Sequence, residues 1–189
     1  MPLISTFAQP LCDLLGKPMI QRVYERAVQA RSLARVVVAT DDERIAATCR
    51  KFGAEVVMTS VFCANGTERC AEAARKIGGG YDILCMLQGD EPLMEPEVID
   101  AAVGALRRAK RRGESRVVYT TPATALAPSD APLRQRVKVV TDLDGDALYF
   151  SRAMIPHNKV RCPGCVVSAW RERDEREARA RSHTVECER

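Results

Sequence analysis

The chain has 189 residues, of which 46% are hydrophobic and 29% are charged, a composition typical of one soluble globular domain. Its 29 Lys and Arg side chains against 25 Asp and Glu side chains give a net charge of +4, which is too small to indicate a nucleic-acid partner. The sequence holds no apolar run of about 18 residues, so it predicts no membrane-spanning helix and no membrane partner.

The first half of the chain alternates helical and strand patterns. Apolar residues recur at helical spacing over 19–28, whereas residues 35–40 form a β-branched run typical of a buried parallel strand. Asp41 and Asp42 are suitable N-caps for the next helix, which we expect to end at Gly53. The expected elements are, in order, helix 19–28, strand 35–40, helix 43–52, strand 54–58, helix 67–77 and strand 82–87.

The second half continues this alternation and then changes character. A helix is expected over 96–111 and a strand over 116–121. Segments 137–141 and 147–151 flank a turn-rich stretch with Gly145, which predicts a β-hairpin. Strands and helices that alternate predict parallel crossover units, and therefore an open α/β sheet covered by helices on both faces.

The composition changes near Val160. Residues 171–181 contain five Arg and four acidic side chains, with no apolar stripe to pack against a core. We therefore expect an ordered domain over 1–159 and a charged, poorly ordered tail over 160–189.

Three polar loops are expected at the ends of strands. They are Thr40–Asp42, Asn65–Arg69 and Gln88–Pro92. Ligands of open α/β sheets bind beyond the carboxyl ends of the strands, and Mg²⁺ is commonly held there by one or two carboxylates together with phosphate oxygens. One of the two carboxylates in the third loop, Asp90 or Glu91, is therefore a candidate Mg²⁺ ligand. The alternative is that Asp90 and Glu91 only cap the helix that follows.

Five motifs occur in a fixed order over most of the chain. They are Leu15-Gly-Lys-Pro-Met-Ile20, Val37-Val-Ala-Thr-Asp41, Asn65-Gly-Thr-Glu-Arg69, Gln88-Gly-Asp-Glu-Pro92 and Ala147-Leu-Tyr-Phe-Ser-Arg-Ala-Met-Ile-Pro156. Together they resemble the 3-deoxy-manno-octulosonate cytidylyltransferases, or CMP-KDO synthetases, from about Pro10 to Lys159. This resemblance implies a three-layer α/β/α, Rossmann-like fold of the nucleotide-diphospho-sugar transferase type, with a mixed, mostly parallel sheet.

The resemblance also implies a reaction and a set of site residues. CMP would pass from CTP to 3-deoxy-manno-octulosonate with Mg²⁺ as cofactor and release of pyrophosphate, a step in lipopolysaccharide or cell-wall polysaccharide synthesis. The expected catalytic residues are Asp90, which would hold Mg²⁺, and Arg152, which would face the sugar-acid carboxylate. The expected substrate-binding residues are Asn65, Gly66, Thr67, Glu68, Arg69, Gln88, Gly89 and Lys138. For Arg69 a surface charge on a helix, and for Arg152 a salt bridge at a strand edge, remain the alternatives.

The chain departs from the family pattern at both ends. Family members start with a strand and a Pro-Ala-Arg-Tyr-x-Ser-x-Arg loop around the triphosphate, whereas Gln9 stands where the lysine after that loop would be. After Lys159 neither the family's His-x-Gly-Ile-Tyr segment nor its dimer surface is recognisable. We therefore expect the ordered domain to be an incomplete cytidylyltransferase with impaired activity, because lost phosphate contacts weaken transition-state stabilisation.

Functions of other classes stay open beside this one. Cys162, Cys165, His183 and Cys187 have the paired spacing of a zinc site, although no apolar core surrounds them and untethered thiols are the simpler interpretation. The chain is alternatively a non-catalytic paralogue or an interaction subunit. Residues 1–9 show no secretory signal, which favours a cytoplasmic location, with an organelle as the alternative if a leader precedes them.

Overall fold

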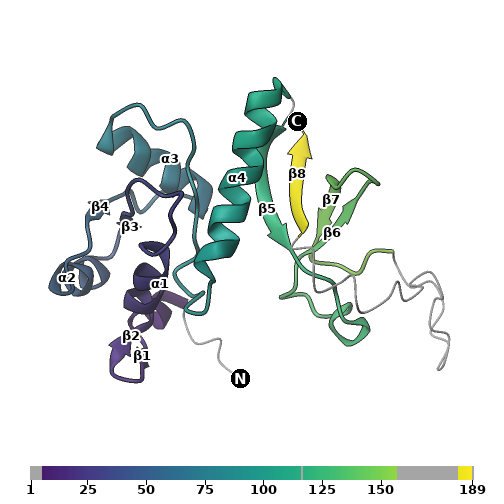
Figure 1. The fold of residues 1–189 in the computed structure, drawn as a ribbon. Helices are drawn as coiled ribbons and strands as arrows, with labels where there is room; N and C mark the ends of the chain where they lie inside the picture. Colours follow the sequence, from purple (N-terminus) through teal and green to yellow (C-terminus); the bar gives the residue numbers. More distant parts are fainter. Residues whose placement is uncertain (1–5, 116, 157–182, 189) are drawn as a thin grey trace. The chain divides into compact units, whose positions relative to one another are not determined.

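The computed structural model describes residues 6–115, 117–156 and 183–188 of the chain (Figure 1). The chain divides into two compact units, Met1–Val103 and Gly104–Arg189. Each unit is described by itself below. Helix α4 (Pro96–Arg112) begins in the first unit and ends in the second.

A small hairpin opens the first unit, after a 3-10 helix η1 (Thr6–Leu11). Strands β1 (Asp13–Leu14) and β2 (Lys17–Pro18) pair in antiparallel fashion. Leu15 and Gly16 between them have φ of 54° and 80°, the two positive values that a tight hairpin turn requires. Helix α1 (Met19–Ala27) follows directly and confirms the helix expected from residue 19.

The centre of the first unit is a strand–helix–strand crossover (Figure 1). Strands β3 (Val38–Thr40) and β4 (Val56–Met58) pair in parallel, with Val38 opposite Val56, and α2 (Glu43–Lys51) connects them. The Asp42 side chain accepts a hydrogen bond from the N–H of Arg44 at 2.8 Å, which caps α2 as the sequence predicted.

The core of this unit lies between α1, α2 and the two parallel strands. Ile20, Cys49 and Ala54 are buried there. Tyr24 and Phe52 pack against them with ring centroids 5.7 Å apart, in a tilted aromatic contact. The apolar faces of two amphipathic helices therefore meet on the strands that they flank.

The segment 82–87 differs from the expected strand. The described residues include no strand there, and Leu84 and Met86 are 56% and 44% exposed. Its apolar composition gives strand propensity, but a strand forms only where a neighbouring strand completes its backbone hydrogen bonds. Within the described ranges β3 pairs only with β4, and no strand is assigned beside 82–87.

Two further helices complete the helical part. Helix α3 (Gly66–Ile77) ends at Gly78, whose φ of 64° is a conformation that glycine adopts without strain. In the first half of α4, the Asp100 carboxylate accepts backbone N–H bonds from Arg31 (3.2 Å) and Ser32 (2.7 Å). These bonds fasten α4 to the loop that follows α1.

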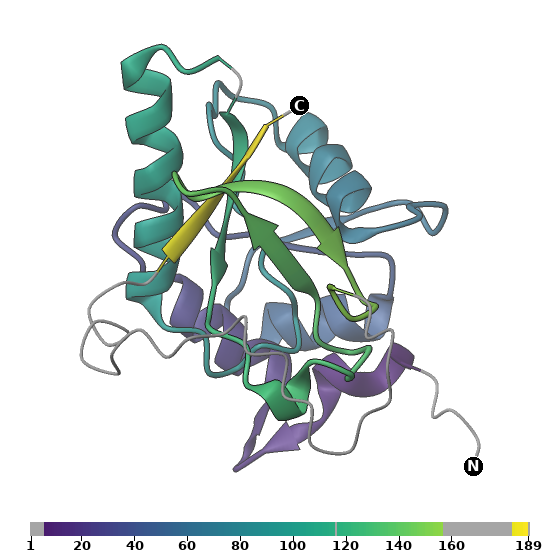
Figure 2. The same cartoon turned by 90° about the vertical axis from the view of Figure 1, so that its right-hand side faces the viewer.

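The second unit contains a four-stranded sheet in the order β5-β8-β7-β6 (Figure 2). Its strands are β5 (Val117–Ala123), β6 (Lys138–Thr141), β7 (Asp146–Ser151) and β8 (His183–Glu188), with a short 3-10 helix η2 (Pro128–Asp130) after β5. Strands β6 and β7 form the expected hairpin, with Lys138 opposite Ser151. In its turn, Asp142 Oδ1 accepts three backbone N–H bonds, from Asp144, Gly145 and Asp146.

Strand β8 is the second difference from the sequence-based expectation. Residues 183–188 pair antiparallel with β5 and parallel with β7, where a poorly ordered tail was expected. The β-branched Thr184 and Val185 give this segment strand propensity, although the residues before it are mostly charged. The rest of the tail, residues 157–182 and 189, lies outside the described residues.

The α/β fold class is confirmed. A parallel strand pair joined through a helix occupies the first unit, and the hairpin near 137–151 occupies the second. Of the helices in the described ranges, none has the length and apolar character needed to cross a membrane.

Candidate functional site

The Asn65–Arg69 motif forms the start of α3 and caps it from both directions. The Asn65 side chain accepts the N–H of Glu68 at 2.9 Å, and the Glu68 carboxylate accepts the N–H of Ala64 at 2.8 Å. This reciprocal pair is a variant of the capping box, in which Glu68 binds the residue before the N-cap, while the Asn65 oxygen satisfies an N–H group that the helix start leaves without an intrahelical partner. Thr67 is exposed in the first turn. These bonds therefore fix the backbone at the start of α3.

Arg69 connects α3 to the ends of both parallel strands. Its guanidinium lies 3.1 Å from the carboxylate of Asp41, which follows β3, and donates to Thr59 Oγ1, which follows β4, at 2.7 Å. Asp41 belongs to a polar loop that the sequence singled out, whereas Thr59 was not predicted. The carboxyl ends of parallel strands meet at one edge of a sheet, and Arg69 connects the ends of β3 and β4 at that edge.

Gly66 brings the second and third polar loops together. A Cβ atom at Gly66 would lie 3.1 Å from the Met86 sulfur and 4.0 Å from the side-chain amide nitrogen of Gln88. The glycine therefore permits a close approach of the α3 start to the segment that carries Gln88. Gly89 is similarly close to α1, because a Cβ there would lie 3.3 Å from Ile20 Cδ1.

Asp90 and Glu91 form a pair of adjacent carboxylates. Both residues are exposed, and a backbone bond from Glu91 N–H to the Gln88 carbonyl (3.4 Å) closes a turn around Gly89. Burial of part of its side chain and the neighbouring Asp90 charge raise the pKa of Glu91. Two hard oxygen ligands that repel one another are a donor set that a divalent cation such as Mg²⁺ fits, because the cation offsets the repulsion.

Lys138 and Arg152 belong to the second unit and lie close to one another. Lys138 is only 5% exposed, and its Nζ donates to the Arg152 carbonyl at 3.0 Å. The Arg152 side chain is exposed and donates to the Arg134 carbonyl at 3.3 Å. The structure thus places the predicted residues in two sets, one in each unit. The first set holds Asn65, Gly66, Thr67, Glu68, Arg69, Gln88, Gly89 and Asp90, and the second holds Lys138 and Arg152.

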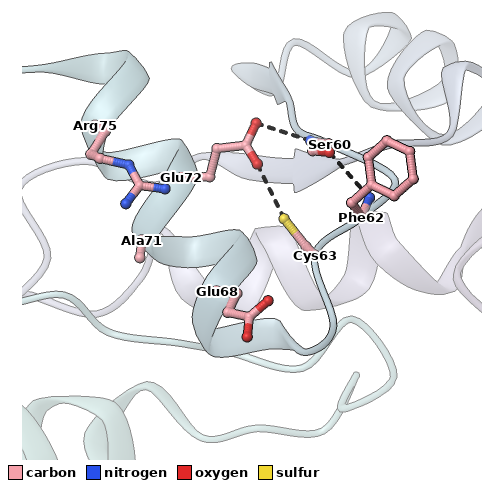
Figure 3. A pocket seen from close by; sticks show the side chains of 7 residues that line it. All are labelled: Ser60, Phe62, Cys63, Glu68, Ala71, Glu72 and Arg75. Atoms are coloured by element: carbon pink, nitrogen blue, oxygen red, sulfur yellow. Dashed lines mark hydrogen bonds between the residues drawn. The ribbon is translucent and has the colours of Figure 1, made fainter.

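A pocket of about 390 Å³ lies between the β4–α3 loop and α3 (Figure 3). The Glu72 carboxylate faces its loop side, where it accepts the N–H of Ser60 at 2.9 Å and the Cys63 thiol at 3.1 Å. Lys76 completes the cluster with a salt bridge to Glu72 at 2.8 Å. Of the predicted site residues only Glu68 lines this pocket. The Glu72 cluster holds the loop that leads into Asn65, and no sequence motif pointed to it.

The zinc alternative is not addressed by the described residues. Cys162 and Cys165 lie outside them, as do the side chains of His183 and Cys187. Within the described ranges, no three His, Cys, Asp or Glu side chains are grouped closely enough to hold a metal ion.

Comparison with known proteins gives one family throughout. A cytidylyltransferase family model matches residues 8–183. Over 151 residues, 80% of the chain, the sequence is 56% identical to 3-deoxy-manno-octulosonate cytidylyltransferase of Zea mays, covering 49% of that protein. Over the same share of the chain it is 53% identical to an Arabidopsis thaliana protein named 3-deoxy-manno-octulosonate cytidylyltransferase, mitochondrial. The match covers 50% of that protein. A protein of Anaeromyxobacter with the same enzyme name is 50% identical, with 59% of its length covered.

A solved structure agrees with the sequence comparisons. It is CMP:2-keto-3-deoxy-manno-octonic acid synthetase complexed with CTP, which matches with a TM-score of 0.65 and 35% identity over 80% of this chain and 60% of that one. The chain spans about half the length of the plant relatives that it matches. The match supports the expected nucleotide-diphospho-sugar transferase fold.

Proposed function

The chain belongs to the cytidylyltransferase family, and from this premise we propose that it transfers CMP from CTP to 3-deoxy-manno-octulosonate and releases pyrophosphate. Relatives that carry the name of this enzyme are 48–56% identical to it. The observation that carries the proposal is the close approach of Gly66 to Gln88, which joins two motifs of that family at one place.

Nucleotide binding is proposed at the start of α3. The capping box of Asn65 and Glu68 fixes the backbone there, and the helix start carries a partial positive charge that favours phosphate oxygens. The side-chain amide of Gln88 offers both a donor and an acceptor to a pyrimidine base. Arg69 would act through its bonds to Asp41 and Thr59, because they hold α3 against the strand ends.

Metal binding is proposed at Asp90, with Glu91 beside it. Mg²⁺, when bound, would neutralise charge that develops on the phosphates during transfer. The residues of this chain would hold the ion with carboxylate oxygens and leave positions open for phosphate. Arg152 would bind the sugar-acid carboxylate, since a guanidinium forms two parallel bonds to a carboxylate.

The test is a pyrophosphate-release assay of the whole chain with CTP, 3-deoxy-manno-octulosonate and Mg²⁺. Release should require both substrates and the metal. Asp90→Asn should reduce turnover by about 100-fold, a loss typical for a group that stabilises transition-state charge. Asp144→Asn, which removes a carboxylate from the exposed β6–β7 turn, is the matched control and should leave the rate unchanged. Equal rates for the two variants would contradict the role of Asp90.

Calorimetric titration with CTP separates binding from turnover. Gln9 is exposed and stands where the family has a lysine, so we propose that the chain binds CTP but turns it over slowly. Gln9→Lys should then raise pyrophosphate release, because a cation offsets charge on the leaving group. A chain that neither binds CTP nor gains activity in this variant would refute the enzyme and favour a non-catalytic paralogue.

A cytoplasmic location is proposed with an organelle as the competing possibility. The Arabidopsis relative carries the word mitochondrial in its name. Subcellular fractionation of the source cells, followed by detection of this chain, distinguishes the two.

A further inference from the structure

Lys138 is a buried lysine at the end of a strand pair. It is the first residue of β6, it lies opposite Ser151, the last residue of β7, and it is 5% exposed. Lysine is almost never fully buried unless its charge is compensated. The groups that compensate the charge of Lys138 therefore indicate the role of this side chain.

All partners of the Lys138 ammonium in the described structure are backbone carbonyls. Nζ donates to the carbonyl oxygens of Leu133 at 2.6 Å, Arg136 at 3.0 Å and Arg152 at 3.0 Å. A lysine ammonium has three protons to donate and no acceptor. These three bonds use all of them, so the ammonium has no proton left for a substrate oxygen.

The three carbonyls belong to two segments that are far apart in the sequence. Leu133 and Arg136 lie in the loop before β6, whereas Arg152 directly follows β7. The Arg152 side chain returns to the same loop, where it donates to the Arg134 carbonyl. Two cations thus join this loop to the residue proposed to bind the sugar acid.

We infer that Lys138 is a positioning residue, which holds the backbone of Arg152 against the 133–136 loop and does not itself contact substrate. The position of the Arg152 guanidinium depends on the position of the Arg152 backbone, and Lys138 Nζ holds that backbone through its carbonyl. Misplacement of a binding group by about 1 Å can cost about 100-fold in rate, so a buried support of this kind affects catalysis without touching the substrate. This inference rests on the proposed function for the role of Arg152, but not for the three bonds.

The test replaces Lys138 with Met, which keeps an unbranched apolar stem up to the ε position and removes the ammonium with all three donors. Amide hydrogen exchange, followed by mass spectrometry, should become faster by about tenfold in segments 133–136 and 151–153, because they lose the bonds that join them. In the pyrophosphate-release assay, the KM for 3-deoxy-manno-octulosonate should rise by about tenfold and the KM for CTP should stay unchanged. Should Lys138→Met fail to fold, Lys138→Gln, which keeps one amide donor group, takes its place in both measurements.

The matched control is Val117→Ala, which removes buried apolar volume from β5 of the same unit. It should lower stability without selective exchange in the two segments. Unchanged exchange in the Lys138 variant, or an equal change in the control, would overturn the positioning role. Faster exchange with an unchanged sugar-acid KM would also overturn it and would leave the proposed function standing. Absence of activity in every variant counts against the proposed function alone, because the exchange measurement needs no ligand.

Discussion

The guanidinium of Arg69 lies 3.1 Å from the Asp41 carboxylate, and so joins α3 to the end of β3. The two side chains are only 22% and 28% exposed, so solvent screens this pair less than it screens a surface salt bridge. A double-mutant cycle with Arg69→Met and Asp41→Asn should therefore give a coupling free energy of about 1 kcal/mol in urea unfolding.

Arg50 and Glu43 provide the matched control for this cycle. They form a salt bridge within the same unit, but their side chains are 51% and 68% exposed. Their coupling should be about 0.3 kcal/mol or less. Equal coupling in both cycles would show that Arg69 is a surface charge on a helix, the alternative that the sequence left open.

Helices were predictable from the sequence because the information that forms them is local. The capping Asp42 and the apolar spacing of residues 19–28 lie within the elements that they specify, and both helices formed where expected. The expected strand at 82–87 did not form, because a strand depends on a partner that is distant in sequence. For the same reason the pairing of β8 with β5 and β7 could not be predicted from its own residues.

The predicted site residues also divide into those whose environment follows from local sequence and those whose environment depends on distant segments. Asn65 and Glu68 have the spacing of a capping box, a local signal that the sequence carries. The bond of Arg69 to Thr59 requires knowledge that two strand ends meet. For Lys138 the resemblance implied a substrate-binding role, whereas its burial and its three bonds to backbone carbonyls depend on how the chain folds and have no local signal.

The Asn65 cap predicts a specific loss of stability. Asn65→Ala removes the acceptor of the Glu68 N–H and should lower the free energy of unfolding by about 1 kcal/mol. Asn65→Ser keeps a capping acceptor oxygen without placing a second carboxylate against Glu68, and should lose little. Urea unfolding of the two variants makes the comparison. If both variants lost the same amount, the amide donor of Asn65 would matter more than its capping oxygen.

Glu72 predicts a dependence of stability on pH. Hydrogen bonds from Lys76 and from the Cys63 thiol lower its pKa from an ordinary 4.5 to about 2. Because the folded pKa lies below the unfolded one, this carboxylate stabilises the protein above about pH 4.5, and that contribution is lost as the pH falls toward 2. Glu72→Gln should therefore be less stable than the wild type at pH 6 and should lose less stability on acidification. Parallel slopes of unfolding free energy against pH for both proteins would contradict this.

The fold should protect the Cys49 thiol from alkylation. It is fully buried in the core with Ile20 and Ala54, and burial raises its pKa to about 11. The thiolate is the reactive form, so the folded protein should leave Cys49 unmodified by iodoacetamide at about pH 8, whereas the exposed Cys12 should react. Denaturation should make both react, because the unfolded thiol regains solvent and its ordinary pKa. Peptide mass spectrometry of the labelled protein measures both sites in one sample. Equal labelling of Cys49 and Cys12 before denaturation would mean that the α2 face opens to solvent more readily than its packing implies.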